Sequence, residues 1–140
     1  VGFPGETDEE HRATLEILRE IKYDDIFSFM YSPRPQTVAA KVYPDDIPED
    51  VKRARLQTVQ MLQGEISLEK NRGLIGTVLP ILIEGESKLG KGQVMGRTRT
   101  NKIVNLMGLK DLIGKTIPVA ITGASANSLM GDTVEARGIA

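Results

Sequence analysis

The 140-residue sequence contains no cysteine, and this absence excludes several kinds of site at once. Without thiols the chain forms no disulfide and offers no thiolate ligand to zinc or to an iron–sulfur cluster. The sequence also has a single histidine, His11, which we place in the first turn of an exposed helix. A catalytic or zinc-binding role for His11 is disfavoured, because no second histidine or cysteine exists to complete such a site.

Long apolar runs are missing too. No stretch reaches the 18 or so apolar residues that would span a bilayer, and no charged and then apolar leader precedes a cleavage site. We therefore expect a cytoplasmic protein without a membrane partner. The 40% of residues that are hydrophobic are enough for a packed core.

A phosphate-binding loop is absent as well. In GESKLGKG, Gly85, Gly90 and Lys91 have the spacing of a P-loop, but Gly92 stands where the magnesium-binding Ser or Thr belongs. The segment after it is typical of a strand, whereas a P-loop leads into a helix. We interpret the stretch as a hairpin turn. With no nucleophile–base pair either, the sequence predicts no catalytic residue and no metal ligand in this chain.

The balance of charged residues differs between the two halves of the sequence. Residues 1–70 carry 14 acidic and 9 basic side chains, and residues 71–140 carry 5 acidic and 9 basic ones. The second half is thus net positive, which favours two modules with different partners, one of them an anionic polymer. A chance split of solvated charges explains the same numbers.

The first half reads as helices and one strand. Thr7 and Glu10 form a capping-box pattern before an amphipathic helix, and the alternating, aromatic-rich stretch at 26–31 predicts a strand. With the apolar start at Val1, this makes a βαβ unit whose strands are parallel. A loop with four prolines follows, and a second helix is predicted to begin at Asp46–Glu49 and to run to about Asn71.

From about Asn71 the hydrophobic pattern becomes short β-rich runs separated by Gly, Asn, Ser and Pro. Five such runs in about 70 residues predict a small β-barrel. The runs are GLIGTVLPILIEGES, GQVMGRTRTN, KIVNLMG, KTIPVAITGASANS and MGDTVEARG. The boundary between the two modules is predicted near Asn71–Gly73.

The stretch GRTRTNK suggests a nucleic-acid contact. On an alternating strand Arg97 and Arg99 share one face about 7 Å apart, which matches successive phosphates, and Asn101 and Lys102 close the turn. Because the module has few aromatic residues, backbone and shape recognition fits better than base stacking. A merely solvated charged face remains the alternative.

Several stretches, in order and with ordinary spacing, resemble the C-terminal portion of MiaB-type tRNA methylthiotransferases. They are VGFPGET, FSFMYSPRPQTVAA, the helix from IPEDVKRARLQ to EKN, GRTRTN and NSLMG. The resemblance implies an α/β part followed by an all-β part. Residues 1–70 would be the C-terminal end of a radical S-adenosylmethionine partial TIM-like barrel, and residues 71–140 a five-stranded, OB-like TRAM β-barrel that binds tRNA.

The resemblance also implies a reaction. The intact enzymes use S-adenosylmethionine and two 4Fe–4S clusters to add a methylthio group to a prenylated adenine beside the tRNA anticodon. The CxxxCxxC cluster motif is absent here. We therefore expect no cofactor bound to this chain alone, no activity from it, and an N-terminal part of the same enzyme as a partner.

Site residues follow from the resemblance at matching positions. Two segments match positions beside S-adenosylmethionine, and one matches the tRNA-facing stretch of the TRAM domain. The cofactor residues are Val1, Gly2, Phe3, Pro4, Gly5, Glu6, Tyr31, Ser32, Pro33 and Arg34, and the RNA residues are Arg97, Thr98, Arg99, Thr100, Asn101 and Lys102. Arg34 fits either the cofactor carboxylate or an RNA phosphate. Gln36 and Val38 stand where the family more often has Gly and Pro.

Two further expectations concern partners. The expected RNA partner is the tRNA anticodon stem-loop, whereas the alternative treats the barrel as a protein-docking module that packs on the rest of its enzyme without touching RNA. A basic patch around Arg97, Arg99 and Lys102 would favour the first and an apolar patch the second. Unpaired strand edges within residues 1–30 also predict self-association.

Overall fold

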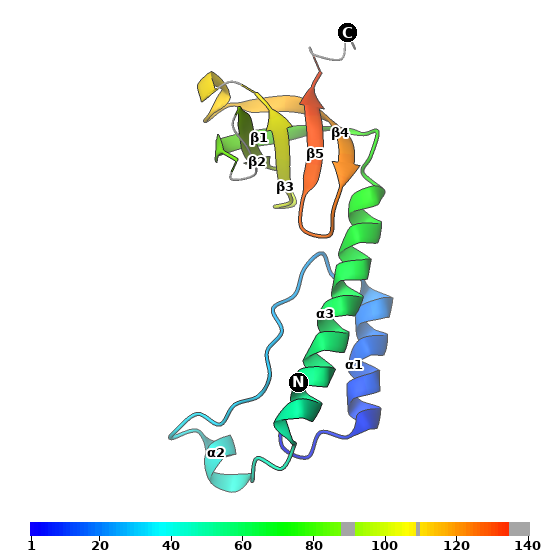
Figure 1. Cartoon of the computed structure of the whole chain (residues 1–140), viewed down its shortest axis with the longest axis vertical. Coiled ribbons are helices and arrows are strands. Elements are labelled where there is room, and N and C mark those ends of the chain that lie inside the picture. The colour runs from blue at the N-terminus through cyan, green and yellow to red at the C-terminus, as the bar shows by residue number, and fades with distance from the viewer. Residues whose placement is uncertain (88–91, 109, 135–140) are drawn as a thin grey trace. The chain divides into compact units, whose positions relative to one another are not determined.

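The computed structural model describes residues 1–87, 92–108 and 110–134, and the chain divides into two compact units, Val1–Ser67 and Leu68–Ala140 (Figure 1). In the first unit, α1 (Asp8–Ile21) begins with the predicted capping box. Thr7 Oγ1 accepts from the Glu10 amide at 3.2 Å, and Glu10 Oε2 accepts from the Thr7 amide at 2.8 Å. This reciprocal pair satisfies two amide groups that the first helical turn leaves without partners.

The long helix α3 (Glu49–Arg72) confirms the second predicted helix. Its apolar residues Val59 and Ile66 are buried against Leu18 of α1, with exposed fractions between 3% and 6%. Half-buried Val1 and Ile26 pack on the same cluster. The loop at the start of the chain and the segment after α1 are therefore both anchored on the core of the first unit.

The predicted strand at 26–31 is wrong, and so is the strand expected at Val1: the structure assigns neither. The local geometry is nevertheless extended, since the Val1 amine donates to Phe29 O at 2.9 Å and the Tyr31 amide donates to Val1 O at 2.8 Å. These two bonds follow the pattern of a parallel pair. No ladder continues from them within the first unit, because the chain turns at Gly2, whose φ is 72°.

A short helix interrupts the proline-rich loop. The sequence predicted no helix there, but α2 (Val38–Val42) forms between two of the prolines. Its N-cap is Thr37, whose hydroxyl accepts from the Ala40 amide at 3.3 Å. Gln36, two residues before the helix, has a φ of 73°, in the left-handed region that disfavours side chains.

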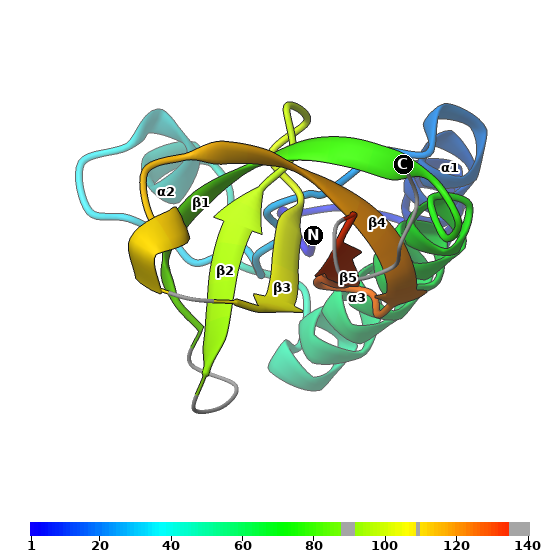
Figure 2. The same cartoon turned by 90° about the horizontal axis from the view of Figure 1, so that it is seen from above.

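The second unit confirms the predicted small barrel of five strands. They are β1 (Val78–Glu86), β2 (Gln93–Arg97), β3 (Ile103–Met107), β4 (Thr116–Ala124) and β5 (Leu129–Thr133). The sheet closes in the order β1-β2-β3-β5-β4, and all pairs are antiparallel except β3 with β5 (Figure 2). A short 3-10 helix, η1 (Lys110–Leu112), lies between β3 and β4.

Alternating residues of every strand fill the barrel interior. The buried side chains are Ile81, Ile83, Val94, Val104, Leu106, Val119, Ile121 and Leu129. The narrow barrel brings backbone close to backbone at Gly96, where a Cβ atom would lie 2.3 Å from Leu82 O. The pairing of β1 with β2 agrees with a hairpin at GESKLGKG, although Lys91 and the rest of 88–91 lie outside the described residues. The end of the predicted run MGDTVEARG, from residue 135, does so too.

None of the helices in the described part of the chain has the length and apolar content needed to span a bilayer.

Candidate cofactor loop and nucleic-acid interface

The two segments predicted to contact a cofactor meet at Val1 and Tyr31. Besides the bond from the Tyr31 amide to Val1 O, the rings of Phe3 and Tyr31 pack edge to face with centroids 5.1 Å apart. Tyr43, which follows α2, also packs edge to face on Phe3, with centroids 5.9 Å apart. The structure thus brings the start of the chain together with the end of the extended segment.

The loop at residues 2–6 is held in a tight conformation by its own carboxylate. Gly2 and Gly5 have φ values of 72° and 79°, which glycine adopts without a steric penalty. The Gly2 amide donates to Glu6 Oε2 at 2.9 Å, and the Glu6 amide donates to Phe3 O at 2.9 Å. Glu6 is therefore a structural element of the loop, with its carboxylate half-buried.

Sequence reasoning missed the charged residues that fix this loop to its surroundings. Arg55 on α3 donates to Glu6 Oε1 and to Glu6 O, both at 2.9 Å, and to Asp8 Oδ1 at 2.7 Å. Asp46 Oδ1 accepts from the Gly5 amide at 2.9 Å. The only sequence signal for this arrangement was that basic residues recur three apart on α3, at Lys52 and Arg55, which a solvated helix face shows as well.

The charges of this cluster affect one another. The hydrogen bond and charge of Arg55 lower the pKa of the Asp8 carboxyl, and the same hydrogen bond raises the pKa of Arg55. Burial lowers the pKa of nearby His11, whose Nε2 lies 2.9 Å from Thr58 Oγ1. The guanidinium of Arg55 thus stays charged, while the imidazole of His11 favours its neutral form.

The remaining predicted cofactor residues stand apart from this contact network. Ser32, Pro33 and Arg34 are exposed, and Arg34 O accepts from the Thr37 amide at 3.3 Å and from its hydroxyl at 2.9 Å. These bonds shape the turn before α2 and leave the guanidinium of Arg34 outside it. Among the described residues, no group of three His, Cys, Asp or Glu side chains comes together as metal ligands would.

The predicted RNA residues occupy the β2–β3 hairpin. β2 ends at Arg97, so the prediction that one strand carries both Arg97 and Arg99 on the same face is wrong. The chain turns instead: the Asn101 amide donates to Thr98 O at 3.0 Å and the Thr98 amide to Lys102 O at 3.0 Å. Asn101 adopts a φ of 66°, which asparagine tolerates better than most residues.

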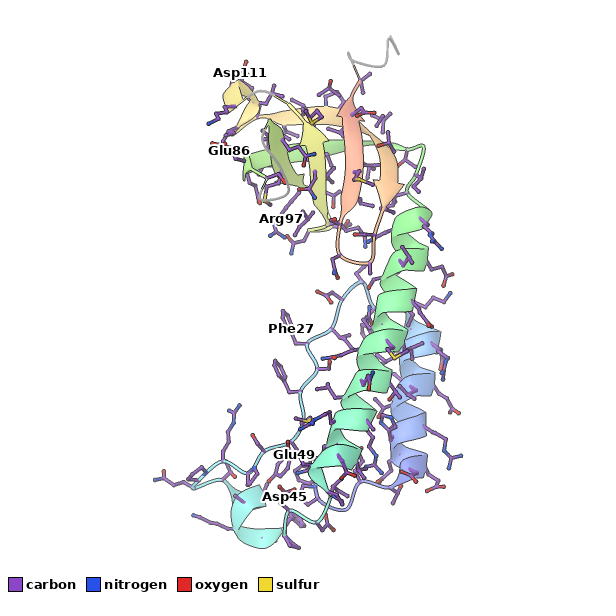
Figure 3. All side chains as sticks on the ribbon, viewed as in Figure 1. Phe27, Asp45, Glu49, Glu86, Arg97 and Asp111 are labelled. Atoms are coloured by element: carbon purple, nitrogen blue, oxygen red, sulfur yellow. The ribbon has the colours of Figure 1, made fainter. Side chains whose placement is uncertain are left out.

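Within this turn the two arginines differ. Arg97 is half-buried, and its guanidinium donates to Glu84 Oε2 at 3.1 Å and to Asn101 Oδ1 at 3.0 Å. Arg99 is exposed at the tip and has no hydrogen-bond or ion-pair partner within the described ranges. Arg97 therefore braces the hairpin, whereas Arg99 presents its charge to solvent. Figure 3 shows Arg97 at the barrel end where this hairpin lies.

The rest of the hairpin is polar and internally hydrogen-bonded. Thr98 is only 9% exposed, its hydroxyl accepts from the Lys102 amide at 3.0 Å, and it lies 3.0 Å from Thr100 Oγ1. The strand partners of Arg97 are apolar: Leu82 on β1, which is 45% exposed, and half-buried Ile103 on β3. This face of the barrel therefore combines basic, polar and apolar side chains.

Comparison with known proteins finds a domain-family match in the second unit and relatives that are similar over nearly the whole chain. Residues 72–134 match the TRAM domain family. The chain is 48% identical over 94% of its length to a tRNA-2-methylthio-N(6)-dimethylallyladenosine synthase of Geotalea uraniireducens (strain Rf4). It is 45% identical over 99% of its length to the synthase of Syntrophobacter fumaroxidans, and 46% identical over 96% to that of Syntrophotalea carbinolica. In each case the chain spans 30% of the relative's length.

Proposed function

We propose that this chain, which corresponds to the C-terminal part of a MiaB-type tRNA methylthiotransferase and contains a TRAM domain at residues 72–134, supplies tRNA binding to that enzyme. The observation that carries the proposal is the exposed guanidinium of Arg99, which has no hydrogen-bond or ion-pair partner in the described part of the chain and lies on a hydrogen-bonded hairpin of the TRAM barrel. A hydrogen-bonded turn that presents a cation suits contact with a phosphate, because binding then restricts little conformational freedom beyond that of the arginine side chain itself.

The intact enzyme, in this proposal, methylthiolates a prenylated adenine next to the anticodon, and the RNA partner is the anticodon stem-loop in the cytoplasm. Residues 1–70 form the C-terminal end of its radical S-adenosylmethionine barrel and residues 71–140 its TRAM part. Because the chain has no cysteine, the ligands of both 4Fe–4S clusters come from outside these residues. Lys102, Thr98 and Asn101 contribute the shape of the RNA-facing hairpin.

S-adenosylmethionine, when bound to the cluster of the intact enzyme, supplies the radical and the methyl group of the reaction. Two observations on this chain suit such a polar ligand beside the Val1–Glu6 loop. Tyr31 Oη is buried and finds no hydrogen-bond partner within the described residues. A Cβ atom at Gly5 would meet nothing within 4 Å, so the backbone is open there. The chain's own residues then bind and orient the ligand.

The test of RNA binding is an affinity titration of the chain with a tRNA anticodon stem-loop across a salt series. We expect Arg99→Ala to weaken binding about fivefold or more and to reduce the salt slope by about one, because one phosphate contact is lost. Lys41→Ala, which removes an exposed cation of α2 in the first unit, is the matched control and should change neither quantity. Absence of wild-type affinity, or equal affinities of wild type and Arg99→Ala, would contradict the proposal.

A second candidate function is protein docking by the barrel, and exposed apolar side chains on β1 favour it. Val78 and Leu82 are 49% and 45% exposed and point outward from the barrel. Leu82→Asn separates the two functions: loss of binding to the N-terminal part of the enzyme with unchanged RNA affinity would assign this face to docking. Loss of RNA affinity alone, in Arg99→Ala, would assign the hairpin to RNA.

A further inference from the structure

Lys52 on α3 is a buried charged residue whose position no sequence motif explains. Its side chain is only 6% exposed, and its ammonium group pairs with Asp45. Nζ also donates to Tyr31 O at 3.4 Å and lies 5.4 Å from the centroid of the Tyr31 ring. A lysine is seldom buried unless its charge is compensated, and here the compensation comes from a carboxylate, a carbonyl and an aromatic face.

The aliphatic part of the same side chain lies against the loop at the start of the chain. A Cβ atom built on Gly2 would lie 2.4 Å from Lys52 Cγ and 3.0 Å from Cδ. The Lys52 stem therefore occupies the space that a side chain at position 2 would need. One residue thus contacts both segments of the candidate cofactor site, the first at Gly2 and the second at Tyr31.

The neighbouring charged residues hold the other end of the loop. Arg55, one turn after Lys52, binds Glu6, and Asp46, next to Asp45, accepts from the Gly5 amide. Asp45 and Asp46 thus act as a pair, one on the lysine and one on the loop. Figure 3 shows Asp45 near the start of α3, at the end of the first unit where these contacts gather.

We propose that Lys52 is a positioning residue for the cofactor, and that it fixes the Val1–Glu6 loop relative to Tyr31 before the ligand binds. This inference rests on the proposed function, because it assigns a role toward S-adenosylmethionine. Preorganised segments bind more tightly, since the free energy of ordering them is not drawn from the binding step. In this proposal Lys52 acts through its contacts with Gly2 and Tyr31 and does not contact the ligand itself.

The test uses Lys52→Met, which keeps a stem of similar length over Gly2 and removes the charge. In the intact enzyme with its clusters we expect the dissociation constant for S-adenosylmethionine to rise about tenfold, while the affinity for the anticodon stem-loop stays unchanged. In the 140-residue chain, hydrogen exchange at the Tyr31 amide should become faster, because its bond to Val1 O loosens. Lys52→Arg should restore part of the affinity, and Lys41→Met is the matched control.

Each outcome decides the proposal. If wild-type enzyme binds S-adenosylmethionine and Lys52→Met binds it equally well, the positioning role is overturned and the proposed function stands. If the wild type does not bind it, the proposed function fails and this inference fails with it. Should Lys52→Met not fold, Asp45→Asn decides: it keeps the lysine stem in place and removes its counter-ion, and unchanged affinity for S-adenosylmethionine would overturn the proposal.

Discussion

Gln36 has a left-handed backbone conformation, which is strained for most residues other than glycine. The family resemblance described for the sequence leads one to expect glycine at this position and proline at that of Val38, and the structure gives Gln36 a φ of 73°. A side chain in this region costs about 1 kcal/mol relative to glycine. Gln36 therefore adopts a backbone conformation that is less favourable than the same conformation would be with glycine at this position.

We expect Gln36→Gly to raise the free energy of unfolding by about 0.5–1 kcal/mol, since relief of strain exceeds the added entropy of the unfolded glycine. Val38→Pro should add a similar gain. Val38 is the first residue of α2, where proline is favoured, and Thr37 before it is already extended at φ −74° and ψ 152°. Urea unfolding measures the free energy of unfolding of both variants. Gln36→Ala is the control, and a gain equal to that of Gln36→Gly would contradict the strain.

His11 provides a pH-dependent contribution to stability. Thr58 Oγ1 donates to Arg55 O at 2.7 Å, so it accepts from His11 Nε2–H, and His11 Nδ1 is left buried without a partner among the described residues. Protonation would place a buried N–H at Nδ1. Burial accordingly lowers the pKa of His11 below its ordinary value of 6.5.

Because the pKa of His11 is lower in the folded state, the unfolded chain binds more protons just below pH 6.5. The contribution is fully present above that pH and is lost as pH falls toward the lowered pKa. We expect the free energy of unfolding of the wild type to decrease between about pH 7.5 and about pH 5, and that of His11→Gln to decrease less. Urea unfolding at each pH measures this, and identical slopes for the two proteins would exclude His11 as the cause.

At the scale of elements, local signals predicted α1, α3 and the barrel strands, whereas α2 and the contacts between residues distant in sequence were not predicted. The Thr7–Glu10 box marks the start of α1 because its bonds join residues three apart. The links that hold the loop, Arg55 to Glu6 and Asp46 to Gly5, join residues 49 and 41 apart. No spacing in the sequence encodes such contacts, so the loop was predicted and its supports were not.

The stretch at 26–31 shows the limit of an alternating pattern. The exposure of the side chains does alternate along this stretch. Phe27 and Phe29 are 91% and 73% exposed, whereas Ile26, Ser28 and Met30 are half-buried. A strand, however, exists only where a neighbour completes the hydrogen bonds, and within the first unit Val1 alone provides two. The alternating pattern thus predicted the extended conformation, but it carries no information on whether a neighbouring strand is present to pair with it.

The same segment leads to a prediction about association. Figure 3 shows Phe27 directed away from α3, and an extended segment with two exposed phenylalanines favours pairing with another chain. We expect the 140-residue chain to self-associate at high concentration and Phe27→Ser/Phe29→Ser to weaken this at least several-fold. Sedimentation velocity measures it, with Met61→Ser, an exposed apolar residue of α3, as the control. A monomeric wild type would contradict the prediction.

At the scale of the whole molecule, the two units have separate cores of different size. Among the residues that the structure describes, the barrel core contains eight buried apolar side chains, whereas the buried cluster of the first unit consists of Leu18, Val59 and Ile66 with partly buried neighbours. Hydrophobic stabilisation scales with the apolar area buried, so the barrel should be the more stable unit. A chain with two such cores is not expected to unfold in a single two-state step.

We predict two thermal transitions, the lower from the first unit and the upper from the barrel. Val59→Ala and Val119→Ala are a matched pair, because each truncates one valine that is at most 3% exposed. Each should cost about 2 kcal/mol, Val59→Ala lowering only the first transition and Val119→Ala only the second. Calorimetry resolves the transitions, and hydrogen exchange at Val59 and Val119 assigns them. If either variant shifted both transitions equally, the units would unfold as one, and the barrel could not be treated as independently stable.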